Sequence, residues 1–158
     1  MELKLKPLSP LLGKEIELPS YATVGSAGMD LRACMEGPLT IPGGKSQAAT
    51  GGQRWVKVPT GFAIQLPGPD YVALIFARSG LATKFGVAPV NAVGVIDSDY
   101  RGEVAVGLIN HGWEDYTIQP GERIAQMVIV PVAQAKLTVT DTLDDTDRGA
   151  GGFGSTGK

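Results

Sequence analysis

The chain has 158 residues, which suits a single domain, and its formal net charge of −2 argues against a long basic groove for nucleic acid. The single cysteine, Cys34, excludes an intrachain disulfide and fits a reducing compartment. No apolar run approaches the ~20 residues of a membrane span, and the N-terminus lacks a signal-peptide pattern. We therefore expect a cytoplasmic protein without a membrane or nucleic-acid partner.

Short strands separated by turns are the main structural signal along the chain. The 22 glycines and 11 prolines break the sequence into pieces that favour strands over helices. Strand candidates lie, in chain order, at 3–8, 29–33, 39–41, 55–58, 61–66, 71–76, 92–96, 104–109, 123–132 and, more weakly, 137–139. The small, polar stretch 43–52 is expected to be a mobile loop, and the only helix expected is a short one near 81–85. This pattern predicts an all-β, antiparallel sandwich, jelly roll or barrel.

The segment 91–102 places two carboxylates and a phenol on a tight turn between apolar arms. β-Branched residues on both sides of a polar turn predict a β-hairpin. Such a hairpin would hold Asp97, Asp99 and Tyr100 in fixed positions, as catalysis requires. The alternative is an ordinary polar turn, in which aspartate and serine bond to the nearby backbone.

The last residues, 144–158, are too polar and glycine-rich to form a core and are expected to be a flexible tail after a domain at 1–143. Gly149, Gly151 and Gly154 match the G-x-G-x-x-G spacing, and the final residues nearly match a P-loop. Both motifs need a strand before them and a helix after, so we set them aside. Glycine amides, Arg148 and Phe153 could still close over a nucleotide as a lid. The alternative is a disordered end.

Five segments in order, 27–33, 78–82, 91–102, 121–126 and 148–157, resemble the motifs of the trimeric deoxyuridine triphosphatase (dUTPase) family. The resemblance covers nearly the whole chain. It implies a β jelly roll, a homotrimer with active sites shared between subunits, and a tail that reaches over from a neighbour. The implied reaction converts dUTP and water to dUMP and pyrophosphate, with Mg²⁺ bound through the substrate phosphates and waters and no direct protein ligand.

The resemblance also implies a role for individual residues. Asp97 matches the carboxylate that activates water for attack on the α-phosphorus, and positioning and charge neutralisation would supply most of the rate. Tyr100 matches the residue beneath the deoxyribose, where its ring leaves no room for a 2′-hydroxyl. Asn91 matches a residue of the uracil pocket, where the backbone of Val95 and Ile96 would read the base edge. Packing in the core or within the hairpin is the alternative for Tyr100.

The remaining matches concern the phosphates and the tail. Phosphate or base contacts are implied for Arg78, Ser79, Gly80, Gln126, Arg148, Phe153, Gly154, Ser155 and Thr156, with Phe153 stacking on uracil. Asp30 is placed near the metal and phosphates without binding them directly. Structural alternatives are a surface ion pair for Arg78, a strand-end contact for Gln126 and a turn hydrogen bond for Asp30.

Three features depart from the family pattern. Ala77 replaces a usual proline, the stretch 42–61 is longer than usual, and positions 155–156 vary within the family. Two other functions compete with the dUTPase hypothesis. One is the related dCTP deaminase, or a bifunctional version of it, which shares the fold. The other is a trimeric β-sandwich with a degenerate site, used for binding or regulation.

Overall fold

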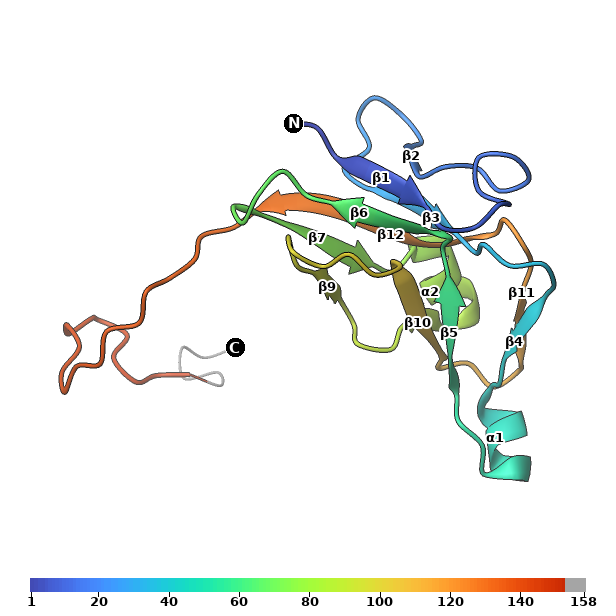
Figure 1. The fold of residues 1–158 in the computed structure, drawn as a ribbon. Coiled ribbons are helices and arrows are strands. Elements are labelled where there is room, and N and C mark those ends of the chain that lie inside the picture. The colour runs from blue at the N-terminus through green and yellow to red at the C-terminus, as the bar shows by residue number, and fades with distance from the viewer. Residues whose placement is uncertain (153–158) are drawn as a thin grey trace.

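Strands make up most of the ordered structure in a computed structural model, which describes residues 1–152 (Figure 1). The elements in chain order are β1 (Lys4–Pro7), β2 (Ser20–Tyr21), β3 (Met29–Arg32), β4 (Leu39–Ile41), α1 (Gly44–Thr50), β5 (Trp55–Pro59), β6 (Phe62–Gln65), β7 (Tyr71–Phe76), α2 (Ser79–Phe85), β8 (Val87–Pro89), β9 (Gly94–Ile96), β10 (Ala105–Asn110), β11 (Tyr116–Ile118) and β12 (Arg123–Pro131). The strands pair antiparallel, which confirms the predicted all-β class.

The largest sheet has the strand order β2-β3-β12-β7-β9. β12 lies at its centre and pairs with β3 on one side and β7 on the other. A second sheet has the order β5-β10-β8, and two further ladders pair β1 with β6 and β4 with β11. This arrangement is an all-β sandwich, and its central strand β12 brings segments from three distant parts of the sequence side by side.

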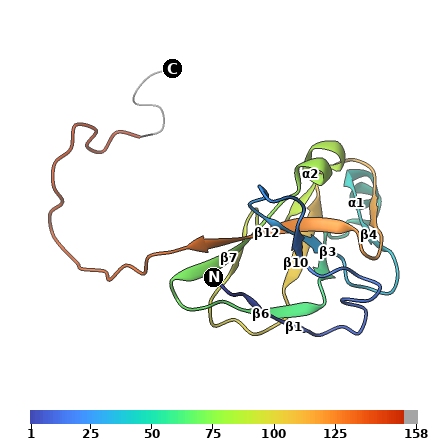
Figure 2. The ribbon, with the colours of Figure 1, turned by 90° about the horizontal axis from the view of Figure 1, so that it is seen from above.

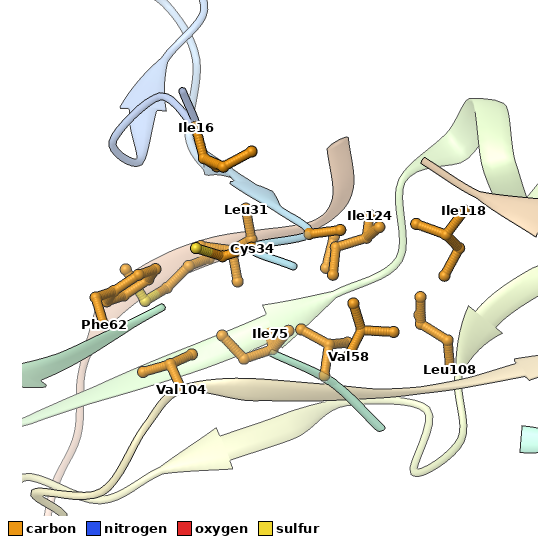
Figure 3. Packing of buried hydrophobic residues seen from close by; sticks show 14 of the residues in the cluster. Ile16, Leu31, Cys34, Val58, Phe62, Ile75, Val104, Leu108, Ile118 and Ile124 are labelled. Carbon is orange, nitrogen blue, oxygen red and sulfur yellow. The ribbon is translucent and has the colours of Figure 1, made fainter. Parts of the chain in front are cut away.

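The core lies between the two larger sheets and is filled by branched aliphatic side chains (Figure 3). Leu31, Ile75 and Ile124 come from the β12-centred sheet, while Val58 and Leu108 come from the β5-β10-β8 sheet. β10 shows why these residues form a strand, because alternate residues along it are buried. That two-residue period places one face of the strand against the core and the other toward solvent.

Two contacts at the edge of the core fix the geometry of the connecting turns. Asn110 is fully buried, and its amide group donates to the carbonyls of Ile41 (3.2 Å) and Glu114 (2.8 Å) while accepting from the amide of Gly112 (2.8 Å). Gly61 has a φ of +78°, and a Cβ there would lie 2.5 Å from the buried Cys34 sulfur. Cys34 is therefore a packing residue, and a larger residue at position 61 would displace it.

The β-hairpin predicted around 91–102 is wrong. β9 pairs with β7, whereas β10 pairs with β5 and β8, so the two arms belong to different sheets. Both arms have strong β propensity, but each finds a more distant partner that buries its apolar side. The turn that carries Asp97, Asp99 and Tyr100 therefore crosses from one sheet to the other.

The segment 43–52 is not the loop that was expected. Residues 44–50 form α1, which ends at Gly51 in the left-handed conformation, with φ +67°. Two short helices, rather than one, thus occur within the described part of the chain. The weak strand expected at 137–139 does not form, and Leu137, Val139 and Leu143 are exposed.

After β12 the chain leaves the body as an extended segment, which both views show (Figures 1 and 2). Its described portion, 132–152, has no helix or strand. No helix within residues 1–152 has the length and apolar character needed to cross a membrane.

The start of α1 is attached to the turn before β11 by backbone hydrogen bonds from Gly44 and Lys45 to residues 112 and 113, and by the side chain of Asp115. Its carboxylate accepts from the Gly43 amide at 2.9 Å. Hydrogen bonds from the Ser46 side chain and then from Gly43 lower the pKa of Asp115 below its usual 3.8. Lys45 and Glu114 form a second contact at 3.7 Å, in which both side chains are well exposed. Such exposed pairs contribute little.

We predict that Asp115→Ala will loosen α1, whereas Glu114→Ala will not, because only Asp115 satisfies a backbone donor. Amide hydrogen exchange across residues 44–50 should quicken in the first variant alone. Since the pKa of Asp115 is depressed in the folded state, its contribution is present above 3.8 and is lost as the pH falls through the folded-state pKa. Equal exchange rates in both variants would assign the attachment to other contacts.

Candidate functional site

Some of the predicted site residues line two separate surface hollows, whereas Gly80, Asn91, Val95, Ile96, Tyr100 and Arg148 line neither. The arginine hollow, of about 290 Å³, is lined by Asp30, Arg78, Ser79, Arg123 and Gln126, together with small residues of 22–28. The Asp97 hollow, of about 660 Å³, is lined by Tyr71, Val72, Asp97, Ser98, Asp99 and Val132 among others.

The two hollows lie at opposite ends of β7. The Asp97 hollow includes Tyr71 and Val72 at its start, whereas Arg78 follows its last residue. At about 3.3 Å per residue, the two ends are roughly 20 Å apart. Asp97 and Arg78 of one chain therefore cannot act on the same phosphate group.

Asp30 is the centre of the arginine hollow. Its Oδ1 accepts from Nε of Arg78 at 3.1 Å, and its Oδ2 accepts from Nη1 of Arg123 at 3.1 Å. The Asp30 side chain is only 19% exposed, whereas those of Arg78 and Arg123 are 25% and 45% exposed. One carboxylate thus orients two guanidinium groups, which keep further N–H donors available for an anion.

Backbone pairing explains why these residues meet. Gln126 on β12 lies opposite Asp30 on β3 and Phe76 on β7. Its Nε2 donates to the carbonyl of Ala77 at 2.9 Å, just before Arg78. A Cβ at Gly28 would lie 2.9 Å from the Gln126 Oε1, so glycine leaves room for that side chain. Gln126 therefore positions the strand end that carries Arg78, which is the structural alternative considered for it.

Arg78 precedes α2 and Ser79 begins it. Arg78 has an extended backbone (φ −89°, ψ 130°), and its Nη1 also donates to the carbonyl of Arg123 at 3.2 Å. The first amides of a helix have no acceptor within the helix. Ser79 and Gly80 are exposed there, and nothing lies within 4 Å of the Gly80 Cβ position. This turn thus offers a hydroxyl and free amides beside two arginines.

Asp97 begins a tight turn whose shape is set by its own backbone. The Tyr100 amide donates to the Asp97 carbonyl at 3.2 Å, and Nη1 of Arg101 donates to the Ser98 carbonyl at 2.8 Å. The Asp97 side chain is exposed. A carboxylate on a fixed turn and open to solvent can accept a proton from a water molecule.

Tyr100 is held across the same turn. Its hydroxyl donates to the Glu103 carbonyl at 3.0 Å, while Glu103 Oε1 accepts from the Gly61 amide at 2.8 Å. The ring lies directly over Gly102, where a Cβ would approach the Tyr100 hydroxyl oxygen to 2.4 Å. Tyr100 remains 43% exposed, so the ring is fixed without being part of the core.

The segment before Asp97 is strained. Ala92 adopts a φ of +62°, which is uncommon for a residue with a Cβ. Asn91 is exposed beside it, and the Val93 amide donates to the Asn91 carbonyl at 2.7 Å. Val95 points outward and is 60% exposed, while Ile96 packs against the core from the edge strand β9. Asn91, Val95 and Ile96 thus share one edge segment.

In the tail, Nε of Arg148 donates to the Gly151 carbonyl at 2.8 Å, and the side chain is exposed. The predicted contacts Phe153, Gly154, Ser155 and Thr156 lie outside the described residues.

Arg123 was missed when roles were assigned from the sequence, although it lies within the 121–126 motif. The available signal was its position three residues before Gln126, which was already assigned to the site, within the same motif. Its neighbour Glu122 accepts from the Tyr116 hydroxyl. Burial, and then this hydrogen bond, raise the pKa of Tyr116 to about 12.

The described residues contain no cluster of potential metal ligands. No group of three or more histidine, cysteine, aspartate or glutamate side chains that could hold a metal ion occurs among residues 1–152.

Comparisons with known proteins agree on one family. The dUTPase family model matches residues 14–157. The chain is 52% identical over 155 residues to deoxyuridine 5′-triphosphate nucleotidohydrolase of Hahella chejuensis, covering 98% of this chain and 96% of that protein.

Solved structures give the same result for the fold. The dUTPase of Staphylococcus bacteriophage 80alpha with dUpNHpp superposes with a TM-score of 0.80 at 25% identity, covering 99% of each chain. A mutant dUTPase from phage phi11 of S. aureus, described with a structural Mg(II) ion, gives a TM-score of 0.73 at 20% identity, covering 90% of this chain and 98% of that one. With nearly its whole length matched by the family model, the chain belongs to the dUTPase family.

Proposed function

We propose that this chain hydrolyses dUTP to dUMP and pyrophosphate in active sites assembled from different copies of a homotrimer. The observation that carries the shared site is the separation of the Asp97 hollow from the arginine hollow within one chain. A second copy would bring the Asp97 hollow of one subunit to the arginine hollow of its neighbour. The nucleotidohydrolase name of a 52% identical relative supports the substrate.

In this proposal, Asp97 orients a water molecule and accepts its proton. The water oxygen bonds to the α-phosphorus, and the bond from that phosphorus to the oxygen bridging to the β-phosphate breaks. Pyrophosphate leaves with the electron pair of that bond. Because an aspartate is a weak base, in-line positioning and charge neutralisation supply most of the acceleration.

The arginine hollow would bind the phosphate chain. Arg78, Ser79 and the Gly80 amide supply donors of three geometries, and Asp30 keeps Arg78 oriented. Mg²⁺ would neutralise charge on the phosphates when bound, held through those phosphates and waters. The residues fit this arrangement. Asp30 lies near the phosphate donors, but both of its carboxylate oxygens already accept from arginines. The metal would therefore be held by phosphates and waters, with Asp30 nearby.

Recognition of the base and sugar would come from the segment around the turn. The Tyr100 ring would pack beneath the deoxyribose and exclude a 2′-hydroxyl. Asn91 and the backbone of Val95 and Ile96 would bind the uracil edge, because paired donors and acceptors reject a mismatched base strongly. Residues 144–158, with Arg148 and Phe153, would close over the nucleotide as a lid separate from the 1–143 domain.

Pyrophosphate release from dUTP, dCTP, dTTP and UTP, each with and without Mg²⁺, tests the reaction. We expect release from dUTP alone, and faster release with Mg²⁺, since the metal neutralises phosphate charge. A phosphate assay after inorganic pyrophosphatase treatment measures it. Ammonia release from dCTP would instead identify a deaminase, and dUTP binding without any release would indicate a binding protein.

Mixing two inactive variants tests the shared site. Asp97→Asn should lower turnover by about 10²–10⁴ while nucleotide binding persists. Arg78→Gln should weaken phosphate binding, so that each variant alone has little activity. When the two variants are mixed at an equal ratio and their subunits exchange, about one site in four combines an intact Asp97 from one copy with an intact Arg78 from its neighbour. The mixture should therefore regain about a quarter of wild-type activity.

Each variant carried separately through the same subunit exchange is the control for that experiment. If Asp97 and Arg78 of one chain worked together, the mixture would be no more active than its components. Gel filtration and circular dichroism before mixing would show whether both variants retain the wild-type fold and assembly.

Gly102→Ala should relax sugar selection, because its methyl group would displace the Tyr100 ring that lies over it. We expect kcat/KM for UTP relative to dUTP to rise by about tenfold or more, with little loss of thermal stability at this exposed turn. Gly68→Ala is a matched control, since nothing lies within 4 Å of that Cβ position. Unchanged selectivity in Gly102→Ala would show that the ring position does not set it.

A further inference from the structure

A third hollow adjoins the arginine hollow and is lined by residues of α2 from Gly80 to Phe85. It has a volume of about 420 Å³ and shares Arg78 and Arg123 with the arginine hollow. We name it the Lys84 hollow after the lysine that lines it but not the arginine hollow. Its other chemistry-bearing residues are Arg32, Phe85, Tyr116 and Glu122. The space is many times the ~30 Å³ of one water molecule, so it can hold a small polyanion.

Positive charge is concentrated around this hollow, although the whole chain carries −2. Its lining includes four cationic side chains, Arg32, Arg78, Lys84 and Arg123, and a single carboxylate, Glu122. Asp30, which neutralises part of the charge of Arg78 and Arg123, lines the arginine hollow instead. The donors that face the Lys84 hollow therefore outnumber the acceptors.

The one carboxylate of the lining is already engaged by the protein. Glu122 Oε1 accepts from the Tyr116 hydroxyl, and its Oε2 accepts from the Gln119 amide at 2.9 Å. Both oxygens of the Glu122 carboxylate thus accept hydrogen bonds from residues 116–119, before β12. Arg32 donates from Nη1 to the Gly121 carbonyl at 3.0 Å and from Nη2 to Glu17 at 2.5 Å. These contacts hold its guanidinium in place and leave further N–H groups for a ligand.

Lys84 differs from the three arginines of the lining. It lies exposed in the last turn of α2, and within residues 1–152 it makes no ion pair within 4.0 Å. Beside it, the Phe85 and Tyr116 rings lie 4.8 Å apart at a 49° tilt. The adjoining Trp113 hollow, of about 340 Å³, shares Lys84, Phe85 and Tyr116 and adds Trp113, which is 64% exposed.

We propose that the Lys84 hollow is a second oligophosphate-binding site, which adjoins the site where dUTP is hydrolysed and shares Arg78 and Gly80 with it. Phosphate oxygens would accept from Lys84 Nζ and from the outward N–H groups of Arg32 and Arg123. The ligand is an oligophosphate chain, supplied either as an inorganic anion or as the tail of a nucleotide. In the second case the base would reach the aromatic surface of Phe85 and Trp113.

Calorimetric titration of the full chain with tripolyphosphate tests this site. Lys84→Gln should weaken binding about tenfold, the effect of losing one charge-assisted contact, while kcat/KM for dUTP stays unchanged. Lys57→Gln is the matched control, because Lys57 is an exposed lysine on β5 that lines none of these hollows. Wild-type binding should also weaken as salt is added.

ATP, which carries the same triphosphate chain, distinguishes the two sources. Binding of ATP tighter than tripolyphosphate, with the same dependence on Lys84, supports a nucleotide ligand, and equal or weaker binding supports an inorganic one. Equal affinities in wild type and Lys84→Gln, or equal losses in both lysine variants, would overturn the proposal. Because the titration needs no dUTP turnover, its result stands apart from that of the hydrolysis assay.

Discussion

The shared carboxylate of Asp30 determines the geometry of the arginine hollow. It accepts from Arg78 and Arg123 at 3.1 Å each, and so links β3, the start of β12 and the turn that begins α2. Removing it would leave the partly buried Arg78 close to the exposed Arg123 without a counter-charge, which is more costly than losing a fully exposed pair. The β12 pairing places these residues in register, and Asp30 then fixes the directions of their side chains.

The all-β class could be predicted from the sequence, and so could the presence of Asp30, Arg78, Gln126 and Asp97 at a site, because apolar alternation and the motif residues are local signals; Arg123 was missed. Asp30, Arg78 and Gln126 are far apart in the sequence and meet only through antiparallel pairing on β12. The hairpin at 91–102 was wrong because local propensity does not identify a strand's partner, and β9 and β10 each pair with a distant strand. α1 was missed because its small residues bury nothing, and its attachment depends on Asp115, 72 residues beyond Gly43.

Because the two hollows are separate, each half of the proposed site is held in place by its own part of the fold. A stiff strand, β7, keeps the turn of Asp97 away from the arginines of the same chain, so neither half of the proposed site depends on the flexibility of the other. Each half is instead fixed by nearby contacts: Asp30 and Gln126 for the arginines, and Gly102 and Glu103 for Tyr100. Such local support is what a preorganised site requires.

Because Cys34 packs against Gly61, the reactivity of the chain's only thiol can report local opening of the structure around it. The sulfur is buried, and the glycine that covers it has no side chain that could swing aside to admit a reagent. Alkylation must therefore wait for the turn at Gly61, which joins β5 to β6, to open. The modification rate then reports the population of open molecules when closing is fast. Since the Gly61 amide also holds Glu103 beside Tyr100, the same measurement would follow the loosening of the turn that carries Asp97.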